Sequence, residues 1–234
     1  MRGRGDAQPL ETSNAKGYAV VANLITVARL ILLFAVIWLI YVGNVQVVTA
    51  CMVLMIVVFA SDGLDGWVAR RRGSTSTFGA VFDILGDRIV ENALWVIFAD
   101  LGLIPIWIPL LVLTRSFVID GLRSISLAEG KTPFGKNNMM KSPITEWLTA
   151  GRFMRAFFGY AKAAGFVFLT GLAGDERLDT ADTTLGWLYD QDWFRWIGWG
   201  FVWAAVALTI IRAIPVIIDT MDYITNDVEP SRPS

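Results

Sequence analysis

Residues 62–70 read DGLDGWVAR and residues 79–87 read GAVFDILGD, which places four aspartates within or beside apolar stretches of membrane-spanning length. A charged side chain at the centre of a bilayer costs about 2.5–3.5 kcal/mol on insertion scales. Ionisable groups inside a membrane are therefore a functional site by default, and their spacing indicates which kind of site.

The composition is that of a membrane protein. The chain has 234 residues, of which 55% are hydrophobic, and it contains ten tryptophans. Apolar runs of spanning length recur along it, and no separate soluble module interrupts them. We expect an all-α integral membrane domain over residues 23–222, with a cytoplasmic segment at 1–22 and a tail at 223–234.

The lack of histidine excludes several kinds of chemistry. The sequence has no histidine and a single cysteine, Cys51, which lies in an apolar run. A Ser-His-Asp or Cys-His site, a histidine-bound zinc or haem, and a disulfide within the chain are therefore impossible. Any proton transfer must use a carboxylate, a lysine or a tyrosine.

Six transmembrane helices are expected. They cover residues 24–42, 46–69, 79–99, 104–127, 153–173 and 194–218, with a short turn at Gly43-Asn44 between the first two. The third is the weakest by hydropathy because four charged side chains lie between residues 83 and 91. We expect those acids to face the protein interior, since lipid cannot solvate them.

The charges of the loops predict the orientation. Three arginines at 70–72 follow the second span, and basic residues dominate the connection between the fourth and fifth spans. The segment 175–192 instead holds six acids and one arginine. The positive-inside rule places the basic loops and both termini in the cytoplasm and the acidic loop outside. Four tryptophans near the acidic loop are expected to form an interfacial anchor: Trp187, Trp193, Trp196 and Trp199.

The four aspartates are expected to form one site. In a helical second span, Asp62 and Asp65 share one face, and in a helical third span Asp83 and Asp87 share another. Both pairs lie at matching distances from the intervening loop, roughly 13–19 Å at 1.5 Å per residue. An antiparallel helix pair would therefore bring the four carboxylates together in a polar cavity that opens to the cytoplasm.

Four adjacent carboxylates need cations. An all-oxygen site suits Mg²⁺, Mn²⁺ or Ca²⁺ rather than zinc or copper, and four negative charges match two divalent ions. Two such ions a few ångströms apart commonly clamp a phosphoryl group during displacement. One of the carboxylates would then accept the proton of an attacking hydroxyl.

The pattern D-x-x-D-G-x-x-A-R, followed after eight residues by G-x-x-x-D-x-x-x-D, resembles the signature of the CDP-alcohol phosphotransferase family at every fixed position. Residues 23–29, NLITVAR, are similar to that family's entry to its first span. The resemblance implies transfer of a phosphatidyl group from CDP-diacylglycerol to an alcohol, with release of CMP and two bound Mg²⁺ or Mn²⁺ ions. It also implies a homodimer. We expect it in a bacterial-type inner or plasma membrane, with no role for nucleic acid and with the active site on the cytoplasmic side, where the loop charges place it.

The resemblance assigns roles to individual residues. Asp87 would be the catalytic base for the acceptor hydroxyl. The expected metal ligands are Asp62, Asp65, Asp83 and Asp87. The residues expected to line the CDP site are Gly66, Ala69, Arg70 and Gly79.

The acceptor alcohol is predicted from arginines. Arg115, and Arg123 beyond it, are similar to a pattern of the phosphatidylglycerophosphate synthase branch, whose acceptor is glycerol 3-phosphate. A phosphate-bearing acceptor needs such cations at the mouth of the site, and Arg152 and Arg155 lie on the same side. Ser116 stands where that branch has Glu, which leaves inositol phosphate or another polar alcohol as an alternative acceptor.

A divalent-cation transporter would also place acids in the membrane. Its acids would follow a path across the bilayer, whereas these gather near one face, and the sequence shows no inverted repeat. The small residues and the arginine of the signature would have no role in transport. The sequence therefore favours the transferase.

Overall fold

The computed structural model describes the backbone of residues 9–72, 77–128 and 152–227. Side chains are described at 23–61, 79, 81–121 and 153–214. The regular elements in these ranges are all α-helices. They are α1 (Pro9–Val42), α2 (Val45–Arg72), α3 (Thr77–Asp100), α4 (Trp107–Ala128), α6 (Arg152–Arg177), α7 (Thr184–Tyr189) and α8 (Asp192–Asp227).

Each of the six predicted spans coincides with one long helix, so the all-helical prediction is confirmed. The turn predicted at Gly43-Asn44 is present between α1 and α2. There the side-chain oxygen of Asn44 accepts a hydrogen bond from the Val47 amide at 3.0 Å, which satisfies one of the free amides at the start of α2. α1 begins at Pro9, well before the expected span, and α7 is a short helix that the sequence reading did not predict.

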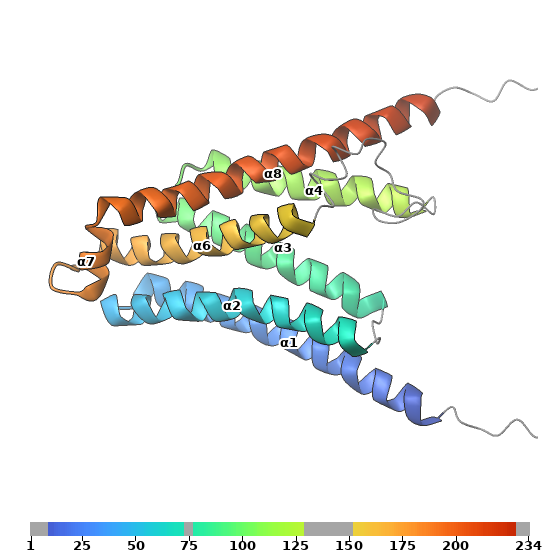
Figure 1. Cartoon of the computed structure of the whole chain (residues 1–234), viewed down its shortest axis with the longest axis horizontal. Helices are drawn as coiled ribbons and strands as arrows, with labels where there is room; N and C mark the ends of the chain where they lie inside the picture. Colours follow the sequence, from blue (N-terminus) through green and yellow to red (C-terminus); the bar gives the residue numbers. More distant parts are fainter. Residues whose placement is uncertain (1–8, 73–76, 129–151, 228–234) are drawn as a thin grey trace, which may run out of the picture.

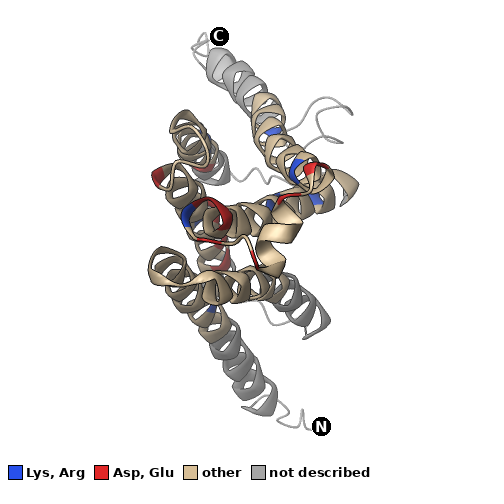
Figure 2. Ribbon diagram, turned by 90° about the vertical axis from the view of Figure 1, so that its left-hand side faces the viewer, with Lys and Arg blue, Asp and Glu red and all other residues tan. Residues whose placement is uncertain are grey.

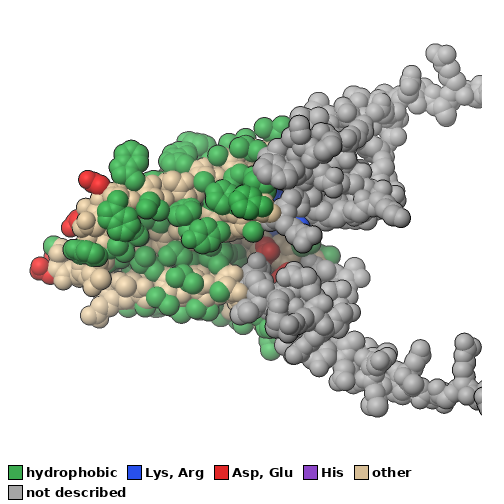
Figure 3. All heavy atoms as spheres, viewed as in Figure 1, with side chains coloured by type: hydrophobic (Ala, Val, Ile, Leu, Met, Phe, Trp, Pro, Cys, Tyr) green, Lys and Arg blue, Asp and Glu red, His purple; other side chains and the backbone are tan. Residues whose placement is uncertain are grey.

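Three of the described helices are long and apolar enough to cross a membrane. These segments are Asn23–Val42, Phe153–Arg177 and Asp192–Ile214, and a shorter apolar stretch covers Val45–Ser61. The surface supports the same conclusion, because apolar side chains cover much of it (Figure 3). Ile31, Trp38 and Phe117 are each more than 60% exposed. Such surfaces belong in lipid, as expected of an integral membrane protein.

The helices form two arms that diverge from the α7 end (Figure 1). α1 packs against both α2 and α3, and α6 packs against both α2 and α8. α4 joins α3 to α8. α1 begins and α8 ends at the end of the molecule opposite α7, as expected for an even number of long antiparallel helices (Figure 1).

The α7 end is closed by aromatic packing. Tyr189 is fully buried, and its hydroxyl donates a hydrogen bond to the Phe168 carbonyl at 2.6 Å. The Phe168 ring stacks on Tyr189 and meets the ring edges of Phe194 and Trp199 within 6 Å between centroids. A Cβ atom added to Gly198 would lie 2.2 Å from the Phe168 ring, so this contact between α6 and α8 requires glycine.

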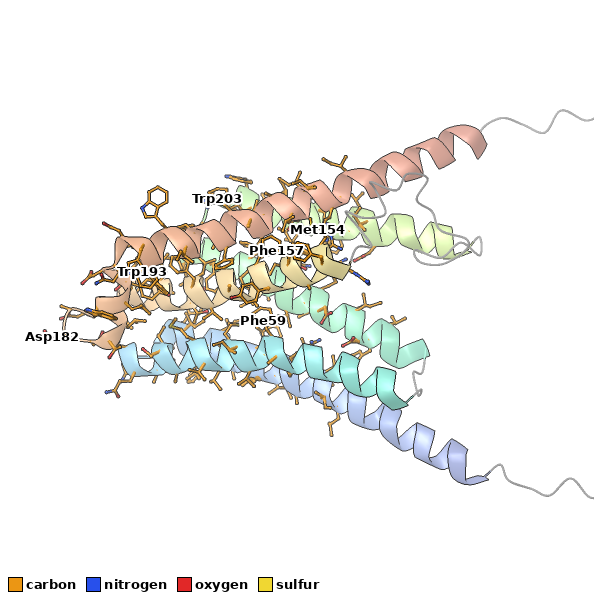
Figure 4. All side chains as sticks on the ribbon, in the orientation of Figure 1. Phe59, Met154, Phe157, Asp182, Trp193 and Trp203 are labelled. Atoms are coloured by element: carbon orange, nitrogen blue, oxygen red, sulfur yellow. The ribbon has the colours of Figure 1, made fainter. Side chains whose placement is uncertain are left out.

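Acidic residues gather at the same end, which faces the viewer in Figure 2. Five acids between residues 176 and 192 are exposed there, and Figure 4 shows Asp182 in the connection between α6 and α7. Of the predicted tryptophan anchor, Trp187, Trp193 and Trp196 are 58–80% exposed. Trp199 instead packs edge-on against Phe168.

Candidate active site

Asp83 and Asp87 lie one turn apart on the same face of α3, as the spacing predicts. Nη2 of Arg29 on α1 lies 2.8 Å from Oδ1 of Asp87 and 3.7 Å from Oδ1 of Asp83. The Arg29 side chain is buried, whereas the two aspartate side chains are 44% and 48% exposed. A buried guanidinium from another helix therefore holds both carboxylates in place and leaves each partly open.

A pocket of about 410 Å³ opens beside Asp87. It lies among α1, α2, α3 and α6, where the two arms begin to separate. Acidic atoms are visible between the arms in Figure 3. Its charged wall consists of Arg29, Asp87, Glu91 and Lys162. Its apolar wall includes Phe59 and Phe166, whose rings stack at 5.8 Å across α2 and α6; Phe59 is labelled in Figure 4.

Glu91 is the second acid in the pocket wall, one turn after Asp87 on α3. Its side chain is only 7% exposed, and its Oε2 lies 3.0 Å from Nζ of Lys162 on α6. Nη1 of Arg88 lies 3.7 Å from the same oxygen, and Arg115 on α4 acts on this carboxylate electrostatically. Three cations from three helices thus surround one buried carboxylate.

Arg88 extends the network to α4. Its Nε and Nη2 each lie 3.1 Å from an oxygen of Asp120, which is a two-point arginine–carboxylate pair. The turn of α3 that carries Asp87 is therefore tied to α1 through Arg29, to α4 through Arg88 and to α6 through Glu91. Such ties fix the direction in which Asp87 points into the pocket.

The remaining signature residues are only partly described. Gly79 lies two turns before Asp87 on α3 and is partly buried. The backbone of α2 is helical through the positions of the other signature residues, as expected, but their side chains lie outside the described residues. Those residues are Asp62, Asp65, Gly66, Ala69 and Arg70.

The arginines predicted for the acceptor occupy two helices. Arg115 of α4 is partly buried near Glu91, and Arg155 is exposed in the first turns of α6. Arg123 and Arg152 belong to α4 and α6, and their side chains lie outside the described residues. Arg212 of α8 stacks on the Phe158 ring at 5.1 Å, which adds a further cation near α6.

The donor set fits divalent ions. The two described carboxylates are oxygen ligands on one helix face, partly open, with a cation already drawn to them. Hard divalent ions prefer such ligands, and Asp62 and Asp65 would supply the rest of the set. In the side chains that the structure describes, no group of three or more acids or cysteines is close enough to hold a metal.

The sequence matches the family model for CDP-alcohol phosphatidyltransferases over residues 19–211. The chain belongs to this family. The match runs from within α1 to within α8 and contains the helices between them, so the family assignment includes the α3 site and the segments that tie it in place.

Several CDP-alcohol phosphatidyltransferases are similar to the chain. A CDP-diacylglycerol–glycerol-3-phosphate 3-phosphatidyltransferase of Bacillus subtilis is 29% identical over 121 residues, which are 47% of this chain and 63% of that protein. A Mycobacterium tuberculosis protein named "Probable phosphatidylglycerophosphate synthase" is 28% identical over 170 residues, 70% of this chain and 80% of its own length. A CDP-diacylglycerol–inositol 3-phosphatidyltransferase of Arabidopsis thaliana is 49% identical over 43 residues, 18% of this chain and 19% of that protein.

Three of the four charged residues in the pocket wall have no role that the sequence predicts. Arg29 and Lys162 are each isolated cations in apolar helices, and Glu91 lies beyond the signature. The signal that would have found them is the cost of an ionisable group in a membrane, which requires a partner for each. The partner of each is visible only in the fold, because helices distant in sequence supply it.

Proposed function

We propose that this CDP-alcohol phosphatidyltransferase moves the phosphatidyl group of CDP-diacylglycerol to glycerol 3-phosphate and releases CMP. The observation that carries the proposal is the half-exposed Asp87 carboxylate, which Arg29 holds at the edge of a pocket. Asp87 lies within the segment that matches the family model. The names of the Bacillus and Mycobacterium relatives, both glycerophosphate enzymes, support this acceptor.

The reaction needs a base at Asp87. The acceptor hydroxyl oxygen forms a bond to the phosphorus of the phosphatidyl group, its proton passes to Asp87, and the bond from that phosphorus to the CMP oxygen breaks. CMP leaves with the electron pair of the broken bond. Asp87 then returns its proton to water, and its position between Arg29 and the pocket aims the carboxylate at the acceptor.

The four signature aspartates would hold two divalent ions, Mg²⁺ or Mn²⁺. When bound, such ions neutralise charge on the transferring phosphoryl group. Gly66, Ala69, Arg70 and Gly79 would line the CDP site, where small side chains admit the nucleotide and the arginine pairs with the diphosphate. Arg115, Arg123, Arg152 and Arg155 would bind the acceptor phosphate.

We further propose that all six long helices cross the membrane, with both termini and the pocket on the cytoplasmic side. The arginines at 70–72 and the basic connection between α4 and α6, against a single arginine in the segment 175–192, support this orientation through the positive-inside rule. We also propose that the enzyme acts as a homodimer, the state that the family resemblance implies.

The test is CMP release by the purified protein with CDP-diacylglycerol, Mg²⁺ and one acceptor at a time. The acceptors are glycerol 3-phosphate, inositol phosphate, inositol and serine. We expect release with glycerol 3-phosphate, and omission of the divalent ion or addition of EDTA should stop it. Release with inositol phosphate alone would make that compound the acceptor, and release with inositol alone is the result that the short Arabidopsis match would favour. No release with any acceptor would refute the transferase assignment.

A further inference from the structure

The ion pair of Glu91 and Lys162 occupies the pocket wall, and the proposed chemistry does not use it. Both residues line the same pocket as Asp87, and they join α3 to α6 at 3.0 Å. A buried ion pair is a poor way to gain stability, because desolvation offsets most of the attraction between the charges. Its position in a substrate pocket therefore suggests recognition in addition to the tie between α3 and α6.

The pair has hydrogen-bonding capacity to spare. The Lys162 ammonium group has three N–H bonds, and among the described side chains it contacts Glu91 and the Phe158 ring, the latter at 4.3 Å. Oε1 of Glu91 is buried and has no hydrogen-bond partner among the described residues. One donor and one acceptor therefore remain at this part of the wall, and an unpaired buried carboxylate oxygen is costly.

A hydroxyl group matches this donor and this acceptor. It donates one hydrogen bond and accepts others, so it can bridge an ammonium N–H and a carboxylate oxygen at once. Glu91 follows Asp87 by one helical turn, which separates their Cβ atoms by about 5–6 Å. An acceptor whose reacting hydroxyl meets Asp87 would place a hydroxyl on the adjacent carbon toward Glu91.

We propose that Glu91 and Lys162 bind the second, non-reacting hydroxyl of the acceptor and so select vicinal diols. This inference rests on the proposed transferase function. It assigns the two residues to specificity, and it leaves the reacting hydroxyl to Asp87 and the acceptor phosphate to the arginines.

The test compares glycerol 3-phosphate with 3-hydroxypropyl phosphate, which has the same chain and lacks only the middle hydroxyl. The wild-type protein should favour glycerol 3-phosphate in kcat/KM by on the order of 10- to 100-fold, the value of a hydrogen bond to charged groups. The double variant E91L/K162M replaces the pair with apolar side chains of similar size, and it should bring the ratio to within about threefold.

The ratio separates recognition from a structural role. A variant that merely loosens the helices loses rate with both acceptors and keeps the wild-type ratio. The matched control is E176L/R195M, which removes an ion pair at the other end of α6. This control should also keep the wild-type ratio of kcat/KM for the two acceptors. If E91L/K162M does not purify folded, Lys162→Arg keeps the charge and alters the donor geometry, so it should lower the ratio several-fold.

The outcomes are distinct from those of the function assay. A wild-type enzyme that uses both acceptors equally, or a pair variant that retains the wild-type ratio, overturns this inference and leaves the transferase intact. A wild-type protein that releases no CMP with either acceptor instead refutes the proposed function.

Discussion

The two ends of the molecule are built in opposite ways. At the α7 end, Phe168, Tyr189 and Phe194 pack ring against ring, and glycine at 198 lets α8 approach α6. At the diverging end, the helices are joined by charges across α1, α3, α4 and α6, around an open pocket. The first end is organised for stability and the second for chemistry.

This difference shows how a membrane protein can keep an open polar site. Apolar packing at one end holds the helices together, so the other end need not close. The charges at the open end are balanced locally, since Arg29, Arg88 and Lys162 each contact an acid from another helix. Pairing of this kind lowers the cost of carrying ionisable groups in a membrane.

Asp87→Asn should have the largest effect, and it tests whether the open end serves chemistry rather than stability. We expect kcat to fall by about 10²–10⁴-fold from lost proton transfer alone, because asparagine cannot accept the proton. The thermal unfolding midpoint in detergent should change little, since Arg29 retains Asp83 as a partner. The measurement is CMP release together with thermal unfolding of the same preparation.

The control for that change is Asp182→Asn, an exposed acid in the connection between α6 and α7. It should leave both rate and unfolding unchanged. An Asp87→Asn enzyme with normal turnover would remove Asp87 as the base.

Gly198→Ala, at the α7 end, should lower the stability of the protein and leave its catalytic rate unchanged, the reverse of Asp87→Asn. The added methyl group would meet the Phe168 ring at 2.2 Å, and overpacking of this kind costs about 1–3 kcal/mol. Gly200→Ala on the same helix is the matched control, because a Cβ there meets no atom within 4 Å and alanine favours the helix. Thermal unfolding should show the loss for Gly198→Ala only, with kcat/KM of the folded enzyme preserved. Equal midpoints for both variants would mean that the aromatic packing is not tight.

The helices and half of the site were predictable from the sequence. Apolar runs interrupted at Gly43-Asn44 and at the charged loops give the six long helices, because helix period and length are local properties. The spacing of Asp83 and Asp87 correctly predicts one face, which Arg29 contacts. These conclusions need only the geometry of a single helix.

The partners of the charged groups could not be predicted in this way. The sequence predicts that the second and third spans pair with each other, but it does not predict that α1 packs against both of them. This packing of α1 brings Arg29 to Asp87. Likewise, the whole of α4 and the segment 129–151 lie between Glu91 and Lys162 in the sequence, so only the fold makes these two residues neighbours. Contacts between distant helices depend on packing that a one-dimensional pattern does not contain.

The buried hydroxyl of Tyr189 offers a more subtle test of the closed end. Burial is the main cause that raises the pKa of this phenol above its ordinary value of about 10, with the charge of Asp175 adding to it. The folded protein therefore keeps the proton at a pH where the unfolded chain loses it. The stability contribution is complete below pH 10 and is lost as the pH rises further, by about 1 kcal/mol at pH 11.

The measurement is the unfolding midpoint of the wild-type protein and of Tyr189→Phe between pH 8 and 11. Below pH 10 the variant should be less stable by about 1 kcal/mol, the value of the lost hydrogen bond to Phe168. Above pH 10 the difference should shrink, because phenylalanine has no proton to lose. A constant difference across this range would show that Tyr189 titrates at its ordinary value in the folded protein.

The smallest expected effect concerns an exposed ion pair on the surface of the α7 end. Nη2 of Arg195 lies 3.7 Å from Oε1 of Glu176, and both side chains are more than 40% exposed. Water and salt screen such a pair, so Glu176→Gln should cost at most about 0.5 kcal/mol, and less in 0.5 M NaCl. Unfolding at low and high salt measures it. A loss comparable to that of Gly198→Ala would show that charge pairing, as well as aromatic packing, holds the α7 end together.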